Sequence, residues 1–226
     1  MEHLPRVSHI SNLSALVATL IDNDGTAAHG YCAPAVARDR QSFVRDLVDF
    51  ADFVHLVTVL HGQIPGLIDY AAARTVEVPA RAWLLQSIEA FAAERQYLSQ
   101  LSVAVGPLPS TSGHNETATL VSQQRHAIEM LAQSDRRGCA LGAAVALVIE
   151  WESIRAILDA GAIRLGIEPP ESGLPTRRET LDLLGALPEP QRLSRAIEFG
   201  VTQLLGQHRG MWDLLQARAQ VRATQH

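Results

Sequence analysis

The chain has 226 residues, of which 47% are hydrophobic, and a formal net charge of −5. This length and composition allow one sizeable core and exclude a disordered or fibrous protein. The acidic balance, without a long run of like charges, argues against nucleic acid or an acidic membrane as a partner, because both attract a basic stripe.

All 19 basic residues are arginine. We interpret this as the codon usage of a GC-rich, bacterial genome. Without a lysine amine, the residues of this sequence cannot form a Schiff base or supply a P-loop lysine. The longest apolar run, CALGAAVALVI at 139–149, is too short to span a bilayer, so we expect a cytoplasmic protein with no membrane partner.

Helical periodicity runs through almost the whole sequence, and no stretch alternates convincingly as a strand would. In chain order, the pattern predicts helices over 9–22, 34–61, 79–103, 115–134, 138–166 and 190–222, with short helices restarting at Pro65 and at the Thr176–Glu179 capping box. We therefore predict an all-α fold, a single up-down bundle of about five long helices. Residues 1–33 would form a short helix and loop packed on a bundle domain of residues 34–226.

Four polar side chains are predicted to face inward with the core. At about 100° per residue, the inward rows of four long helices contain His61, Glu94, Glu150 and His208. Asp52, in contrast, is expected on the solvent side of its helix. Because a buried polar group without a partner is costly, these groups should be hydrogen-bonded, and Glu150 could pair with Arg95.

The same four residues have the side chains that bind iron, manganese or zinc. In architecture and residue type, residues 40–220 resemble the ferritin-like helical proteins. That family carries Glu-x-x-His on two helices, whereas Glu94 and Glu150 are followed here by Tyr97 and Ser153. The resemblance implies a metal site with Glu94, Glu150, His61 and His208 as ligands, and redox chemistry if the protein is an enzyme.

Glycines beside the two histidines suggest another ligand. Gly62 follows His61, and His208 lies between Gly206 and Gly210. A flat molecule could approach the backbone closely there, an arrangement similar in general to haem-oxygenase-like bundles, so haem or another apolar ligand is the runner-up. Because the chain turns just after His61, this residue is expected at the mouth of a pocket.

Whether the protein is an enzyme is left open by the sequence. The alternative is a non-enzymatic regulatory or interaction protein whose inward polar residues are structural. The expected partner is a small molecule or a metal ion, with a homodimer as a further expectation. Arg136 and Arg137, just before a helix start at Gly138, are expected as turn charges that could also contact a phosphate.

Overall fold

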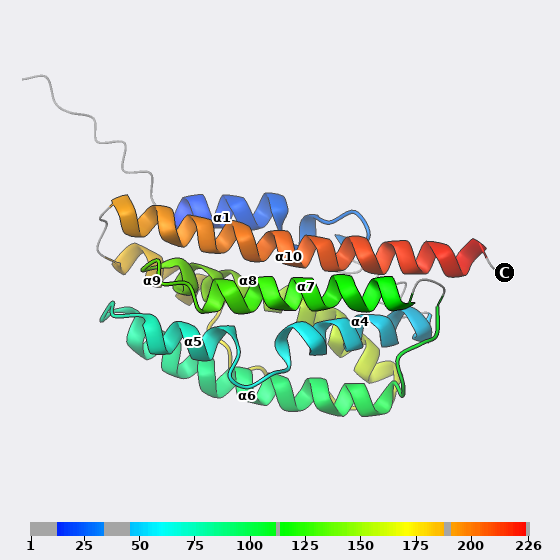
Figure 1. Ribbon diagram of the computed structural model, residues 1–226. Coiled ribbons are helices and arrows are strands. Elements are labelled where there is room, and N and C mark those ends of the chain that lie inside the picture. Colours follow the sequence, from blue (N-terminus) through cyan, green and yellow to red (C-terminus); the bar gives the residue numbers. More distant parts are fainter. Residues whose placement is uncertain (1–12, 34–45, 112–113, 188–190, 225–226) are drawn as a thin grey trace, which may run out of the picture.

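The computed structural model describes residues 13–33, 46–111, 114–187 and 191–224, and every regular element within these ranges is helical. The predicted all-α class is therefore confirmed. Figure 1 shows the helices stacked side by side, with α10 running the length of the molecule. The elements are α1 (Leu13–Asp24), the 3-10 turn η1 (Thr26–Ala28), α4 (Leu47–His61), α5 (Leu67–Arg74), α6 (Ala80–Ala104), α7 (His114–Ala132), α8 (Cys139–Arg164), α9 (Arg177–Ala186) and α10 (Gln191–Thr224). Residues 34–45 of the helix predicted from Pro34 lie outside the described ranges. A continuous helix over 34–61 does not form, because Asp46 has an extended backbone and caps α4, which begins at Leu47.

Helix α8 is the centre of the fold. All of its residues from 139 to 151 are buried, as expected for a helix that is apolar on every side. Helices α5, α7, α9 and α10 pack on it. At the crossing with α10, a Cβ on Gly142 would collide with the backbone of Ile197, and one on Gly200 with the carbonyl of Cys139. Two glycines thus bring the two helix backbones into direct contact.

The break after α4 follows the sequence prediction. The Gly62 amide closes the helix by donating to Thr58 O at 2.8 Å, and Pro65 stands between this end and α5. Helix α5 begins where the Asp69 carboxylate accepts a hydrogen bond from the Gly66 amide at 2.7 Å. His61 consequently occupies the last turn of α4, at the point where the chain changes direction.

The N-terminal helix α1 belongs to the same core as the rest of the chain. Leu13, Val17 and Ile21 are buried in the main hydrophobic cluster, and α1 packs on α9 and α10. The capping box predicted for α9 is present, since the Glu179 amide donates to Thr176 Oγ1 at 3.2 Å. No helix among the described residues is long and apolar enough to cross a membrane.

Candidate functional site

Three of the four inward polar residues meet in the middle of the protein. His61 of α4, Glu150 of α8 and His208 of α10 are 5%, 2% and 1% exposed, as their helical positions predicted. The Nε2 atoms of the two histidines lie 3.0 Å apart, and His208 Nδ1 lies 3.3 Å from Glu150 Oε2. These contacts form a continuous carboxylate–imidazole–imidazole chain across three helices.

The carboxylate end of this chain is anchored by the loop after α1. Glu150 Oε2 accepts hydrogen bonds from the amide and the hydroxyl of Thr26, at 2.8 and 2.7 Å. Trp212 Nε1 in turn donates to Thr26 Oγ1 at 3.0 Å. A side chain at Gly25 would collide with the Glu150 carboxylate, so glycine lets the loop backbone come this close. The amide and the hydroxyl of Thr26 both donate to Glu150, and His208 Nδ1 lies at a distance that allows a third hydrogen bond.

The two histidine contacts are compatible with one order of donation along this hydrogen-bond chain. If His208 Nδ1 donates to Glu150 and the ring carries a single proton, His208 Nε2 accepts a hydrogen bond from His61 Nε2. His61 Nδ1 is then left without a proton and is the basic end of the chain. Burial, followed by the proximity of His208 and Arg95, lowers the pKa of His61 well below its usual value, so this imidazole is neutral near pH 7.

His61 also lines a small pocket at the break between α4 and α5. The pocket has a volume of about 30 Å³ and is bordered by Pro65, Tyr70 and, from α7, Arg125. A recess of this volume has room for about two water molecules. The Nε of Arg125 is buried without a hydrogen-bond partner, although it lies 3.4 Å from Glu129 Oε1. A base and a cation thus border one recess large enough for a single small group.

Arg95 joins the end of α4 to the start of α5 beside this recess. Its Nε donates to the His61 carbonyl at 3.4 Å, and its Nη2 donates to Asp69 at 2.7 Å. A Cβ at Gly66 would lie 2.7 Å from Arg95 Nη2, so only glycine leaves room for this guanidinium. The expected pairing of Arg95 with Glu150 is therefore wrong, because the first turn of α5 supplies the Asp69 carboxylate as its partner.

Glu94, the fourth candidate, lies in a separate polar cluster. Its carboxylate accepts from Arg155 Nη1 at 2.6 and 2.7 Å, from Trp151 Nε1 at 3.0 Å and from Ser172 Oγ at 2.8 Å. Arg155 also donates to Asp159 at 2.6 Å and to a backbone carbonyl. The segment after α8 folds over Arg155 and buries it.

The four residues predicted as metal ligands are divided between two polar clusters. Among the described residues, no group of three or more His, Cys, Asp or Glu side chains is arranged to hold a metal ion. The Glu94 carboxylate is engaged by Arg155, which leaves His61, His208 and Glu150 as the residues that stand close together. A single ligand set made of all four predicted residues does not form.

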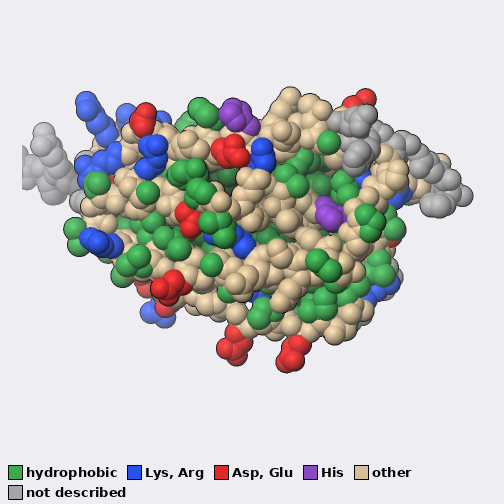
Figure 2. Space-filling model, turned by 60° about the horizontal axis from the view of Figure 1, so that its bottom comes forward, with side chains coloured by type: hydrophobic (Ala, Val, Ile, Leu, Met, Phe, Trp, Pro, Cys, Tyr) green, Lys and Arg blue, Asp and Glu red, His purple; other side chains and the backbone are tan. Residues whose placement is uncertain are grey.

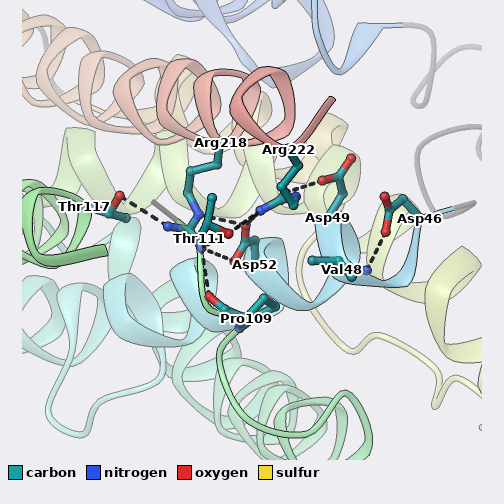
Figure 3. Close-up of polar contacts among 9 residues, drawn as sticks. All are labelled: Asp46, Val48, Asp49, Asp52, Pro109, Thr111, Thr117, Arg218 and Arg222. Carbon is teal, nitrogen blue, oxygen red and sulfur yellow. Dashed lines mark hydrogen bonds and ion pairs between the residues drawn. The ribbon is translucent and has the colours of Figure 1, made fainter. Parts of the chain in front are cut away.

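A second buried network joins α4 to the end of α10 (Figure 3). Asp52 is completely buried and forms a bidentate ion pair with Arg218, with N–O distances of 2.7 and 2.8 Å. Arg222 Nη1 donates a third hydrogen bond to Asp52 at 2.7 Å. Arg222 also pairs with Asp49. The expectation that Asp52 faces solvent is wrong, because α10 and the loop carrying Thr111 cover that side of α4.

Sequence reasoning also missed Thr26. It lies in a loop, outside any helical register, and contacts residues 124 and 186 positions away. The one local signal was Gly25 before it, a small residue at a turn.

The fold and the site together define an all-helical protein with a buried carboxylate–imidazole chain that ends at a pocket. Residues 21–223 match a protein family of unknown function (DUF6975), and the chain belongs to that family. The matched range includes Thr26, His61, Glu150 and His208. No match to a curated protein or to a solved structure was found.

Proposed function

We propose that the protein binds a small organic acid in the recess over His61 and exchanges a proton with it. The observation that carries the proposal is the buried Glu150–His208–His61 chain, whose outer imidazole lines a pocket. The recess admits one group of about the size of a carboxylate, and Arg125 at its border offers a cation for that group.

The hydrogen-bonded chain Glu150–His208–His61 explains how the buried imidazole of His61 could accept a proton despite its lowered pKa. A proton taken up on His61 Nδ1 would be balanced by transfer of the Nε2 proton of His61 to His208 Nε2. The positive charge then resides on His208, beside the Glu150 carboxylate, rather than on His61 near Arg95. The Glu150 carboxylate, 3.3 Å from His208 Nδ1, would lie in direct contact with this charge.

Nitrogen NMR on protein labelled at histidine tests the proposal directly. We expect His61 to carry its proton on Nε2 and His208 on Nδ1. Added acetate or lactate should shift the His61 Nδ1 resonance saturably, and Arg125→Gln should weaken this response by about tenfold, since a charged contact is lost. The exposed Arg164 provides the matched control, Arg164→Gln, which should respond like the unaltered protein. A His61 resonance that no small acid shifts, or that shifts equally in Arg125→Gln, would contradict the proposal.

A metal bound between the two histidines is the second candidate. Two imidazole nitrogens on one tetrahedral metal lie about 3.3 Å apart, close to the 3.0 Å separation of the His61 and His208 Nε2 atoms. Glu150 would then orient His208 from behind, as outer carboxylates do in metal sites. Elemental analysis tests this candidate, which requires near-stoichiometric iron, manganese or zinc that is lost in His208→Ala. Protein without metal and without a response to small acids would favour the non-enzymatic alternative, in which the inward groups are structural.

A further inference from the structure

Five arginines gather where α7 turns into α8 and α10 begins. They line two adjoining hollows of about 520 and 280 Å³, and the described residues that border the larger one are Leu193 and four arginines, Arg136, Arg137, Arg192 and Arg195. Arg74 contributes to the smaller hollow, and Arg136 and Arg137 line both. Figure 2 shows arginine side chains concentrated at the left end of the molecule, where these helix ends meet.

Most of this charge is not balanced by neighbouring carboxylates. Arg74 pairs with Asp135 at 3.0 Å, and Arg137 Nε pairs with Glu77 at 2.7 Å. Within the described part of the chain, Arg136, Arg192 and Arg195 form no ion pair, and all three are exposed. In a chain with net charge −5, such a cluster creates a local positive field that opposes its own assembly.

The turn at Gly138 places the arginines of this cluster close to one another. Gly138 adopts a left-handed conformation with φ of 95°, and a Cβ there would lie 2.6 Å from Leu193 Cδ1. The turn therefore sits directly against the first turn of α10, which brings Arg136 and Arg137 beside Arg192 and Arg195. The guanidinium of Arg136 is placed over the Phe199 ring, 5.3 Å from its centre.

We propose that these hollows bind a small soluble ligand that carries two adjacent phosphoryl groups. Guanidinium groups form paired hydrogen bonds to phosphate oxygens, and several of them around one hollow are typical of phosphate recognition. Two hollows that share Arg136 and Arg137 suit two linked phosphoryl groups better than one. The first turn of α8, whose Ala140 and Leu141 line the smaller hollow, adds the positive end of a long helix dipole. Among the described residues, this site has none in common with the His61 pocket, so either proposal can fail alone.

Calorimetric titration with inorganic pyrophosphate tests the proposal, with orthophosphate and sulfate as comparison ligands, in about 150 mM salt so that diffuse attraction is screened. We expect saturable binding of one pyrophosphate, at least about tenfold tighter than orthophosphate. Arg192→Gln with Arg195→Gln should weaken it by about tenfold or more, and both side chains are exposed, so the variant should fold normally.

The matched control removes the same charge elsewhere. Arg164 is at the far end of α8, and Arg209 lies on α10, about 20 Å along the helix from Arg195. Arg164→Gln with Arg209→Gln should leave pyrophosphate binding within about twofold of the unaltered protein. Equal weakening in both double variants, or the absence of saturable binding, would overturn the proposal.

Two further readouts separate the alternatives. Pyrophosphate should raise the midpoint of thermal unfolding of the unaltered protein and not that of Arg192→Gln/Arg195→Gln, because only a ligand of the native state stabilises it. Co-sedimentation with phosphatidic acid vesicles that pyrophosphate fails to displace would overturn the proposal in favour of a lipid headgroup.

Discussion

Asp52 shows how strongly the stability of a fold can depend on one buried side chain. It is fully enclosed, and it neutralises Arg218 and part of the charge of Arg222. Removing one member of such a network leaves the others charged and without compensation. This network joins the last turns of α10 to α4, so its loss should destabilise the whole core.

We predict that Asp52→Asn lowers the free energy of unfolding by about 3–5 kcal/mol, since it leaves the buried Arg218 guanidinium without a carboxylate partner, while Arg222 keeps Asp49. Denaturant titration measures this loss. The double change Asp52→Leu with Arg218→Met should recover a large part of it, because an apolar pair has no charge to bury.

The control for this prediction is a pair of the same type on the surface. Asp182 and Arg178 lie 3.7 Å apart with both side chains mostly exposed, so Asp182→Asn should change stability by less than about 0.5 kcal/mol. A loss below about 1 kcal/mol in Asp52→Asn would show that water reaches the pair and screens it.

The inward direction of single residues could be predicted only where one helix face is buried. His61, Glu94, Glu150 and His208 are all buried, as the helical period required. Asp52 could not be placed in this way, because α4 is covered on more than one side. Partners across the core, such as Thr26 for Glu150, depend on how distant segments meet and leave no trace in local spacing.

Among the helix contacts, the crossing of α8 and α10 depends on two residues that have no side chain, Gly142 and Gly200. We predict that Gly142→Ala or Gly200→Ala lowers the free energy of unfolding by about 3 kcal/mol, because each new methyl group would press on the backbone of the other helix. Thermal and chemical unfolding of the two variants measures the loss.

Gly206 offers the matched control on the same helix. A Cβ there would meet no atom within 4 Å, so Gly206→Ala should leave stability unchanged or raise it by about 0.5–1 kcal/mol through helix propensity. If Gly142→Ala were equally harmless, the two helices would not be in backbone contact.

Most element boundaries followed from the sequence because strong local signals mark them, whereas α4 begins at Leu47, after the Asp46 cap, and not at Pro34. Pro65, the capping box at Thr176 and the glycine at 138 each lie at the helix start or break that they predicted. The buried face of α7 was less predictable. Leu120 is 48% exposed, whereas its neighbour Val121 and Ile128 are buried. This helix has few apolar residues, so two neighbouring faces fit its pattern about equally well.

At the scale of the whole molecule, the buried histidine makes stability depend on pH. The pKa of His61 is held well below its usual value by burial and by the nearby His208 and Arg95. Below about pH 6.5 the unfolded chain binds a proton at this residue that the folded chain does not bind. Stability should therefore fall as the pH falls, by up to about 1.4 kcal/mol per pH unit for this one group.

Denaturant titrations between about pH 7 and pH 5 would show this slope. In His61→Gln the slope should be smaller, while contributions from other groups, including Asp49 with its raised pKa, remain in both proteins and cancel in the comparison. Parallel curves for the two proteins would show that His61 is protonated in the folded state as readily as in the unfolded one.

The anchoring of Glu150 by the loop after α1 has a consequence for synthesis. Thr26 leaves the ribosome long before its partners, since Glu150 follows 124 positions later and Trp212 186 positions later. Helix α10 packs against α1, α4, α7 and α8, so none of these can complete its core contacts while α10 is still untranslated. We therefore expect the nascent chain to remain open to chaperones until translation passes α10, and the buried carboxylate to be among the last groups to lose contact with water.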